Sequence, residues 1–331
     1  MLNVRVLGVP PNDNALLLVA DGGKSRTRML FDCGADTLAG ISHGEVQAIA
    51  HLFLTHLHMD HVSGFDAFFR VNFQRSNMEN HIWGPTGTAR ILHHRFQGFW
   101  WSHAAELCGT WFVHDVDATT VHDYRFEAGE AFAVMHDAGM RSHDGTILET
   151  AEVRVEAIPL VHHGLCLGYA VREPDRQTID AGALAALGLK PGAWIAELKN
   201  PDNSSIVIDG QVCDAGDLRQ QLVRIEKGES FAYLTDFLAD EEQRQRIAPR
   251  LAGVDTLYAE AQYAVEDDAL ARKYHHSTID QIAELARLAK VGRYMLLHLS
   301  RRYSPDQWVK MCECARAIFP NSGFIDEWEL G

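Results

Sequence analysis

Short apolar segments separated by turn residues recur along the chain and predict β-strands. In the first half they cover residues 4–7, 15–19, 29–31, 51–54 and 153–158. In the second half they cover residues 205–208, 231–234, 256–259 and 294–297, and some of these are followed by amphipathic stretches. Strands and helices therefore alternate there, and we expect an α/β protein in which two sheets are sandwiched between helices.

The clearest helical pattern begins close to Thr278, where apolar residues recur at helical spacing as far as Ala286. Ser277 directly precedes this pattern, and Asp280 follows three residues later. A serine followed by an acidic residue at that distance is typical of a capping box. We therefore predict a helix over about residues 277–290 with Ser277 as its N-cap.

Residues 172–205 interrupt the alternation of strands and helices. This segment contains charged pairs and five turn-favouring residues, namely Pro174, Gly182, Gly188, Pro191 and Gly192. Composition alone fits a solvated loop with one short helix equally well. We expect a single domain over residues 1–331 with an inserted arm at about residues 170–205.

Composition limits the classes of protein that remain possible. A chain of 331 residues that is 47% hydrophobic can bury a substantial core. A net charge of -15 argues against non-specific attraction to nucleic acid or anionic lipid, although a local positive site remains possible. The chain has six scattered cysteines, no signal-peptide pattern and no apolar run near the roughly 18 residues that span a bilayer. We expect a cytoplasmic protein with reduced thiols and no membrane partner.

The most informative stretch is residues 55–61, which directly follows the apolar run of residues 49–54. It contains four metal-binding side chains, His56, His58, Asp60 and His61. Imidazole nitrogens and carboxylate oxygens are the ligands that zinc prefers, and the two-residue step from His56 to His58 turns both rings toward one side of an extended segment. Asp60 and His61 can then serve a second ion.

Three later apolar runs each end in a further candidate ligand. These are His162 or its neighbour His163, Asp236 and His298. Strand ends gather at one edge of a sheet, so residues far apart in the sequence can meet there. The full set of five imidazoles and two carboxylates suits two zinc ions with a bridging carboxylate. Manganese or iron would accept several of the same ligands.

These motifs, taken together, resemble those of metallo-β-lactamase-fold hydrolases, and within that superfamily those of ribonuclease Z. The superfamily motif covers residues 31–34 and 55–61. The narrower resemblance extends over most of residues 155–331 and is most specific in His276-Ser277-Thr278 and in residues 297–303. It implies an αββα sandwich of two mixed β-sheets flanked by helices.

The resemblance also implies the role of each ligand. One zinc would be held by His56, His58 and His162, the other by Asp60, His61 and His298, with Asp236 bridging. His162 is preferred to His163 because its spacing to Gly168 matches the family. Asp32 would orient a ligand, although a simple turn residue is the alternative.

The resemblance further implies phosphodiester cleavage by a metal-activated hydroxide, because a metal lowers the pKa of bound water to about 7. Asp60 would accept the proton of the attacking water. His276 would protonate the leaving 3′ oxygen, with Glu260 as an orienting partner. His275 is expected to make only a local hydrogen bond.

The substrate that the resemblance implies is a tRNA precursor, cleaved at its 3′ end by a homodimer. Residues 7–14, however, are shorter than the matching segment of the family and lack its basic pair, and Lys190 and Lys199 are the only lysines of the expected arm. The alternative is a related hydrolase that acts on a small phosphodiester or on another ester or lactone. A non-catalytic binding protein is disfavoured because all seven ligand positions are filled.

One aromatic segment, residues 95–125, has no counterpart in the resemblance. It contains Phe99, Trp100, Trp101, Trp111 and Phe112. Large aromatic side chains most often fill a core, which is the role we expect here. A platform on which nucleic-acid bases stack is the alternative.

Overall fold

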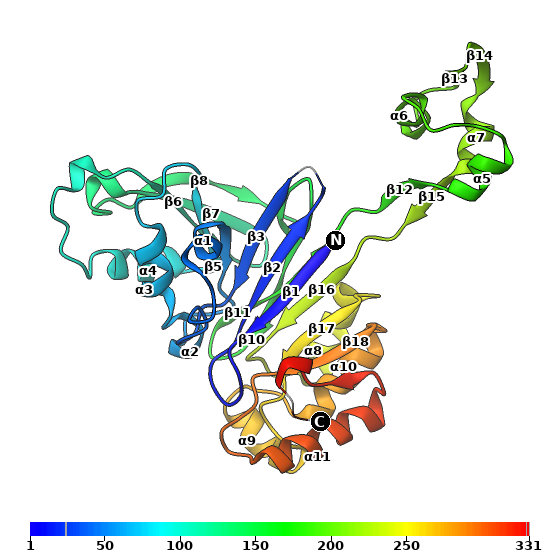
Figure 1. Cartoon of the computed structure of the whole chain (residues 1–331). Coiled ribbons are helices and arrows are strands. Elements are labelled where there is room, and N and C mark those ends of the chain that lie inside the picture. The colour runs from blue at the N-terminus through cyan, green and yellow to red at the C-terminus, as the bar shows by residue number, and fades with distance from the viewer. Residues whose placement is uncertain (24, 329, 331) are drawn as a thin grey trace. The chain divides into compact units, whose positions relative to one another are not determined.

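The computed structural model describes residues 1–23, 25–328 and 330. The chain forms two compact units, the first made of Met1–Arg172 with Glu229–Gly331 and the second made of Glu173–Gly228 (Figure 1). In the described part of the chain, no helix has the length and apolar character that crossing a membrane would require.

The first unit contains an eight-stranded sheet in which the strands lie side by side in chain order. Its outer pairs are antiparallel, whereas β3, β4, β5 and β6 run parallel. The strands are β1 (Leu2–Leu7), β2 (Ala15–Asp21), β3 (Arg26–Phe31), β4 (Ile49–Phe53), β5 (Asn80–Pro85), β6 (Thr110–Val116), β7 (Thr120–Glu127) and β8 (His136–Ser142). The carboxyl ends of β3 and β4 therefore lie at the same edge.

A second sheet of seven strands has the order β19-β18-β17-β16-β11-β10-β9. Its strands are β9 (Thr146–Glu149), β10 (Arg154–Val161), β11 (Leu165–Arg172), β16 (Ser230–Leu234), β17 (Thr256–Glu260), β18 (Arg293–Leu297) and β19 (Ser322–Gly323). Strands β16 to β19 are parallel, and β10 shares their direction because β11 is antiparallel to both β10 and β16. The carboxyl ends of β10, β16, β17 and β18 therefore lie at one edge.

Strand β2 shows how the core is built, because both of its faces are buried. Leu16 and Leu18 belong to the core between the two sheets, whereas Leu17 belongs to the core beneath the helices on the other face. Successive side chains of a strand point to opposite faces, which explains this division. The continuous apolar run at residues 15–19 is thus the pattern of a strand buried on both sides.

Helices cover the outer faces of the sheets, as Figure 1 shows for α3 and α4 and for α10 and α11. The helices of this unit are α1 (His43–Gln47), α2 (Met59–Val62), α3 (Phe65–Asn72), α4 (Thr88–Phe96), α8 (Glu241–Ile247), α9 (Asp268–Lys273), α10 (Ile279–Ala289) and α11 (Pro305–Ile318). The predicted sandwich of two mixed sheets between helices is confirmed.

The start of α10 differs from the prediction by one residue. Thr278, not Ser277, is the N-cap, and the side chain of Gln281, not Asp280, accepts from its backbone N–H at 3.2 Å. The Ser277 hydroxyl instead donates to the Phe237 carbonyl at 2.5 Å and accepts from the Ala239 N–H at 2.9 Å. It is bound to the loop after β16, a contact that local sequence could not indicate.

The second unit has a small core of its own. Its helices are α5 (Ala181–Ala186), α6 (Trp194–Lys199) and α7 (Ala215–Leu222), and its strands are β12 (Arg176–Ile179), β13 (Ser205–Ile208), β14 (Gln211–Asp214) and β15 (Val223–Glu226). Trp194, Leu198 and Leu222 are among its buried apolar residues. The expected arm ended at about residue 205, whereas this unit runs on to Gly228 because β12 pairs with β15.

Candidate metal centre

The predicted ligands all follow strands whose carboxyl ends lie at the sheet edges described above. The set comprises His56 and His58 after β4, Asp60 and His61 in α2, His162 after β10, Asp236 after β16 and His298 after β18. In the described residues these side chains form two groups that could each hold a cation.

The first group consists of His56, His58, His162 and Asp236, and one ligand atom from each lies within 4.8 Å of the others. His56 Nε2 is 3.7 Å from Asp236 Oδ2. Only His58 is exposed to solvent, while the other three side chains are buried. His163 is exposed and lies outside the group, so the structure brings His162 into it.

The second group consists of Asp60, His61, Asp236 and His298, with the same 4.8 Å limit between ligand atoms. His61 Nε2 lies 3.5 Å from Asp236 Oδ2, and His298 Nε2 lies 3.5 Å from Asp236 Oδ1. Asp60 Oδ2 is 3.5 Å from His61 Nε2 and 3.4 Å from His298 Nε2. Asp236 belongs to both groups, and its two oxygens lie between them.

Hydrogen bonds behind the rings determine which nitrogen faces the centre. The Nδ1 atoms of His56, His61 and His162 are 3.1 Å from Thr55 Oγ1, 2.7 Å from Asp32 Oδ2 and 2.9 Å from the His275 carbonyl oxygen. Histidines that bind metals usually have such a partner on the second nitrogen. The opposite atoms, Nε2 of His56 and of His61, are buried without a hydrogen-bond partner. Orphaned imidazole nitrogens beside carboxylates fit a bound divalent cation.

Asp32 connects both sheets to this centre. Its carboxylate accepts from the Thr55 N–H at 2.8 Å and from the Tyr233 hydroxyl at 2.9 Å, in addition to its contact with His61. It reaches Thr55 because the Asp32 N–H bonds to the Phe53 carbonyl where β3 and β4 end together. Asp32 is fully buried. It therefore orients His61 as well as forming the turn after β3.

Three of these residues have a left-handed backbone, which is uncommon for residues other than glycine. The φ angles of Asp32, Asp236 and His298 are 59°, 53° and 51°. Such conformations cost on the order of 1–3 kcal/mol each and cluster at functional sites. Asn14, which sequence reasoning missed, supports one of them because its Oδ1 accepts from the His298 N–H at 3.2 Å.

The charge states suit cation binding. Burial and the neighbouring His61 lower the pKa of His56 to about 2, and burial lowers the pKa of His162 to about 4. Burial would raise the pKa of Asp236, but His298 and His61 outweigh it and hold this pKa well below its usual range. For His61, burial opposes protonation, yet Asp32 and Asp236 raise its pKa well above the ordinary value. Without a cation the protonated form of His61 is therefore favoured, and binding of a cation would release that proton.

His276 and Glu260 form a pair beside the two groups. His276 Nδ1 lies 3.0 Å from Glu260 Oε2, and the His276 ring centroid is 4.9 Å from that of His162 and 6.1 Å from that of His298. Glu260 is fully buried and also accepts from the Phe237 N–H at 2.7 Å. Burial would lower the pKa of His276, but the Glu260 carboxylate raises it to about 9.

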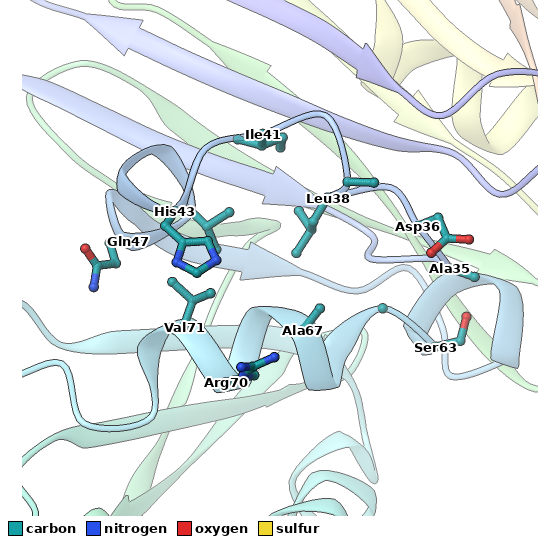
Figure 2. Close-up of a pocket in the computed structure, with 13 residues that line it drawn as sticks. Ala35, Asp36, Leu38, Ile41, His43, Gln47, Ser63, Ala67, Arg70 and Val71 are labelled. Atoms are coloured by element: carbon teal, nitrogen blue, oxygen red, sulfur yellow. The ribbon is translucent and has the colours of Figure 1, made fainter.

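A separate cavity of about 500 Å³ lies between α1, α3 and the turn before α1 (Figure 2). Leu38, Ile41 and Val71 give it apolar walls, and His43 and Arg70 are among its polar lining residues. The described residues that line it include no member of the two ligand groups. The cavity therefore does not form the candidate centre.

Comparison with known proteins places this geometry in context. The β-lactamase superfamily domain matches residues 27–215. The chain is 52% identical over 331 residues to ribonuclease Z of Deinococcus radiodurans, covering 100% of both sequences. Among solved structures, it resembles the metallo-β-lactamase fold protein YhfI from Bacillus subtilis (TM-score 0.56, 13% identity, 98% and 96% covered). It also resembles human tRNase Z, short form (TM-score 0.50, 18% identity, 91% and 93% covered). The two structural likenesses support the fold alone.

Proposed function

The chain belongs to the ribonuclease Z family of the metallo-β-lactamase superfamily, and we propose from this premise that it cleaves tRNA precursors endonucleolytically at their 3′ ends. The observation that carries the proposal is the pair of ligand groups joined by Asp236, with His276 beside both. Full-length identity of 52% to a ribonuclease Z favours tRNA over a small ester or lactone as substrate.

Seven residues are proposed to hold two divalent cations. His56, His58 and His162 would bind one, Asp60, His61 and His298 the other, and Asp236 would bridge them. A donor set of imidazoles and carboxylates suits zinc, and manganese or iron would accept several of the same groups. Bound cations of this kind lower the pKa of water to about 7 and neutralise charge on a phosphodiester.

The chain's own residues move the protons. Asp60 is the least buried carboxylate of the centre, with 44% of its side chain exposed, so it can accept the proton of an attacking water. His276 holds its Nδ1 against Glu260 and can therefore donate a proton from Nε2 to the leaving 3′ oxygen. Glu260 acts by positioning His276 and by favouring its protonated form.

The experiment that tests this proposal compares three histidine variants by metal analysis and by cleavage of a precursor tRNA. His276→Ala should retain both metals and lose about 10²- to 10⁴-fold in cleavage, as expected for removal of a general acid. His58→Ala should lose metal as well as activity. His163→Ala is the matched control, since this exposed neighbour of His162 should change neither.

A second substrate separates the activity from its alternative. Wild-type protein should cleave both precursor tRNA and bis(p-nitrophenyl) phosphate. Cleavage of the small ester alone would replace the proposal with a small-substrate hydrolase. Full activity of both His276→Ala and His58→Ala in metal-analysed protein would overturn the assignment of the centre.

We further propose that the protein is a cytoplasmic homodimer, as the family resemblance implies. The arm is proposed to be Glu173–Gly228 within an otherwise single catalytic domain. Sedimentation of the purified protein tests the dimer, because a monomer at assay concentration would contradict it.

A further inference from the structure

The loop after α4 presents Trp100 to solvent, whereas its neighbour Trp101 is partly buried. Trp100 is 93% exposed and Phe99 is 43% exposed. Trp101 instead packs against Phe73 and Phe132 at centroid distances of 5.7 Å and 5.0 Å. The expectation that the aromatics of this segment fill the core therefore does not hold for Trp100.

The backbone around Trp100 is anchored on both sides. Phe99 contacts Phe69 of α3 at a centroid distance of 5.8 Å. Trp101 donates its indole N–H to the Phe96 carbonyl at 2.8 Å. Contacts of both neighbours thus hold the loop that carries Trp100, which reduces the backbone freedom that a bound ligand would have to restrict.

The charge around this loop differs from that of the whole protein. The chain carries a net charge of -15, yet residues 80–105 contain no aspartate or glutamate. Arg90 and His94 lie one turn apart in α4, and both are exposed. The next acidic residue, Glu106, lies 3.7 Å from the ring of His103. Residues 80–105 are therefore a segment of an acidic chain that carries no negatively charged side chain.

Several arginines of the arm, by contrast, are engaged within that unit. Arg219 donates to the carbonyls of Leu198 and Asn200 at 2.6 Å each, and Arg224 pairs with Asp180 at 3.1 Å. These groups complete the local structure of the arm. Because these arginines are already engaged, phosphate contacts made by another surface would add to the affinity of the protein for an RNA.

We propose that Trp100 stacks on an unpaired base of the RNA substrate, with Arg90 and His94 donating hydrogen bonds to the adjoining phosphates. Exposed aromatic and basic side chains together bind single strands without reading their sequence, and here the basic side chains belong to the helix that precedes the Trp100 loop. A phosphodiester strand suits this segment because residues 80–105 supply arginine and histidine side chains and no carboxylate of their own to repel phosphates. The proposal rests on the RNA-cleaving function.

The test measures binding of a fluorescein-labelled single-stranded oligouridylate by anisotropy in Trp100→Ala, Trp100→Phe and wild-type protein. Trp100→Ala should bind about 5- to 100-fold more weakly, the range that loss of one base stack produces. Trp100→Phe should recover most of the affinity. Met140→Ala is the matched control, because Met140 is an apolar side chain of β8 with 67% exposure.

Further measurements keep this proposal distinct from the proposed function. Hydrolysis of bis(p-nitrophenyl) phosphate should be unchanged in Trp100→Ala, since the chemistry lies elsewhere. Weaker oligouridylate binding by this variant would support the surface even if the wild-type protein failed to cleave precursor tRNA. Equal binding by wild type and Trp100→Ala would overturn the surface. A change in sedimentation of Trp100→Ala without a change in RNA binding would also overturn it, and would assign the loop to protein contact.

Discussion

Two groups of histidines adjoin strand β4, and their ring nitrogens meet different partners. The candidate centre follows the carboxyl end of β4, whereas His51 of β4, His81 of β5 and His114 of β6 form what we call the histidine row. In the row, Trp83 donates its indole N–H to His51 Nδ1 at 3.3 Å, and His81 Nδ1 is 3.1 Å from His114 Nε2. His114 Nδ1 is 2.6 Å from Asp123.

Burial lowers histidine pKa values in both groups. It lowers the pKa of His51 to about 3 and that of His81 to about 4, much as burial and His61 lower the pKa of His56 to about 2. The difference lies in the partners: His56 and His61 have buried ring nitrogens without a hydrogen bond, and the described atoms of the row include none. Unsatisfied nitrogens that converge with carboxylates, rather than a high count of histidines, therefore distinguish the candidate metal site.

The largest expected effect comes from removing the charge that the two ligand groups share. Asp236→Asn should abolish binding of both metals and lower cleavage by more than about 10⁴-fold, because the centre supplies most of the acceleration. Asparagine tolerates the left-handed backbone at this position, where φ is 53°, so the fold should survive. Metal analysis and circular dichroism check both points.

The control for that variant is His114→Gln in the histidine row. It should retain two metals per chain and near wild-type cleavage, although burial of His114 predicts a loss of stability. If His114→Gln lost metal as completely as Asp236→Asn, the distinction between the two groups would fail.

Local patterns explain how much of the centre the sequence could predict. Each ligand directly follows an apolar run, so His56, Asp236 and His298 were accessible from strand ends alone. Contacts between residues that are distant in the sequence could not be predicted in this way. Asn14 reaches His298 across 284 residues of sequence, and Tyr233 reaches Asp32 across 201.

The end of the arm and the N-cap of α10 both depend on contacts between residues that are distant in the sequence. Between β12 and its partner β15 the chain contains α5, α6, α7 and the β13–β14 hairpin, so composition around residues 172–205 could not show where the unit ends. Ser277 is bound to the loop after β16 rather than to the helix. Thr278 is the N-cap in its place, because Ser277 makes a tertiary contact that the local capping pattern does not indicate.

A smaller effect is expected from the carboxylates behind the rings. Asp32 lies 2.7 Å from His61 Nδ1 in the centre, and Asp123 lies 2.6 Å from His114 Nδ1 in the row. Asp32→Asn should weaken metal affinity by about 10- to 100-fold, as loss of such a partner typically does. Asp123→Asn is its matched control and should leave metal affinity unchanged. Competition with a chromogenic chelator measures both, and equal weakening would show that neither effect acts through the ligand.

The smallest effect is a dependence of stability on pH that originates in the row. The folded-state pKa of His81 is about 4 and that of His51 about 3, whereas an unfolded histidine titrates near 6.5. Between these values the unfolded chain binds protons that the folded chain cannot, so the free energy of unfolding falls as the pH drops below about 6.5. From pH 6.5 to 5 each group should contribute a loss of about 1.6 kcal/mol.

His81→Gln should therefore flatten this dependence, while its stability at pH 7 also changes because the contact with His114 is altered. Urea unfolding of chelator-treated wild type and variant at pH 7 and pH 5 measures the difference of differences, which removes the common contribution of the ligand histidines. The loss in free energy of unfolding between pH 7 and pH 5 should be smaller by about 1–2 kcal/mol in the variant, because a glutamine cannot take up the proton. An unchanged slope would mean that His81 already titrates normally in the folded protein. The row would then be open to water and protons, and the contrast with the buried nitrogens of the centre would rest on burial after all.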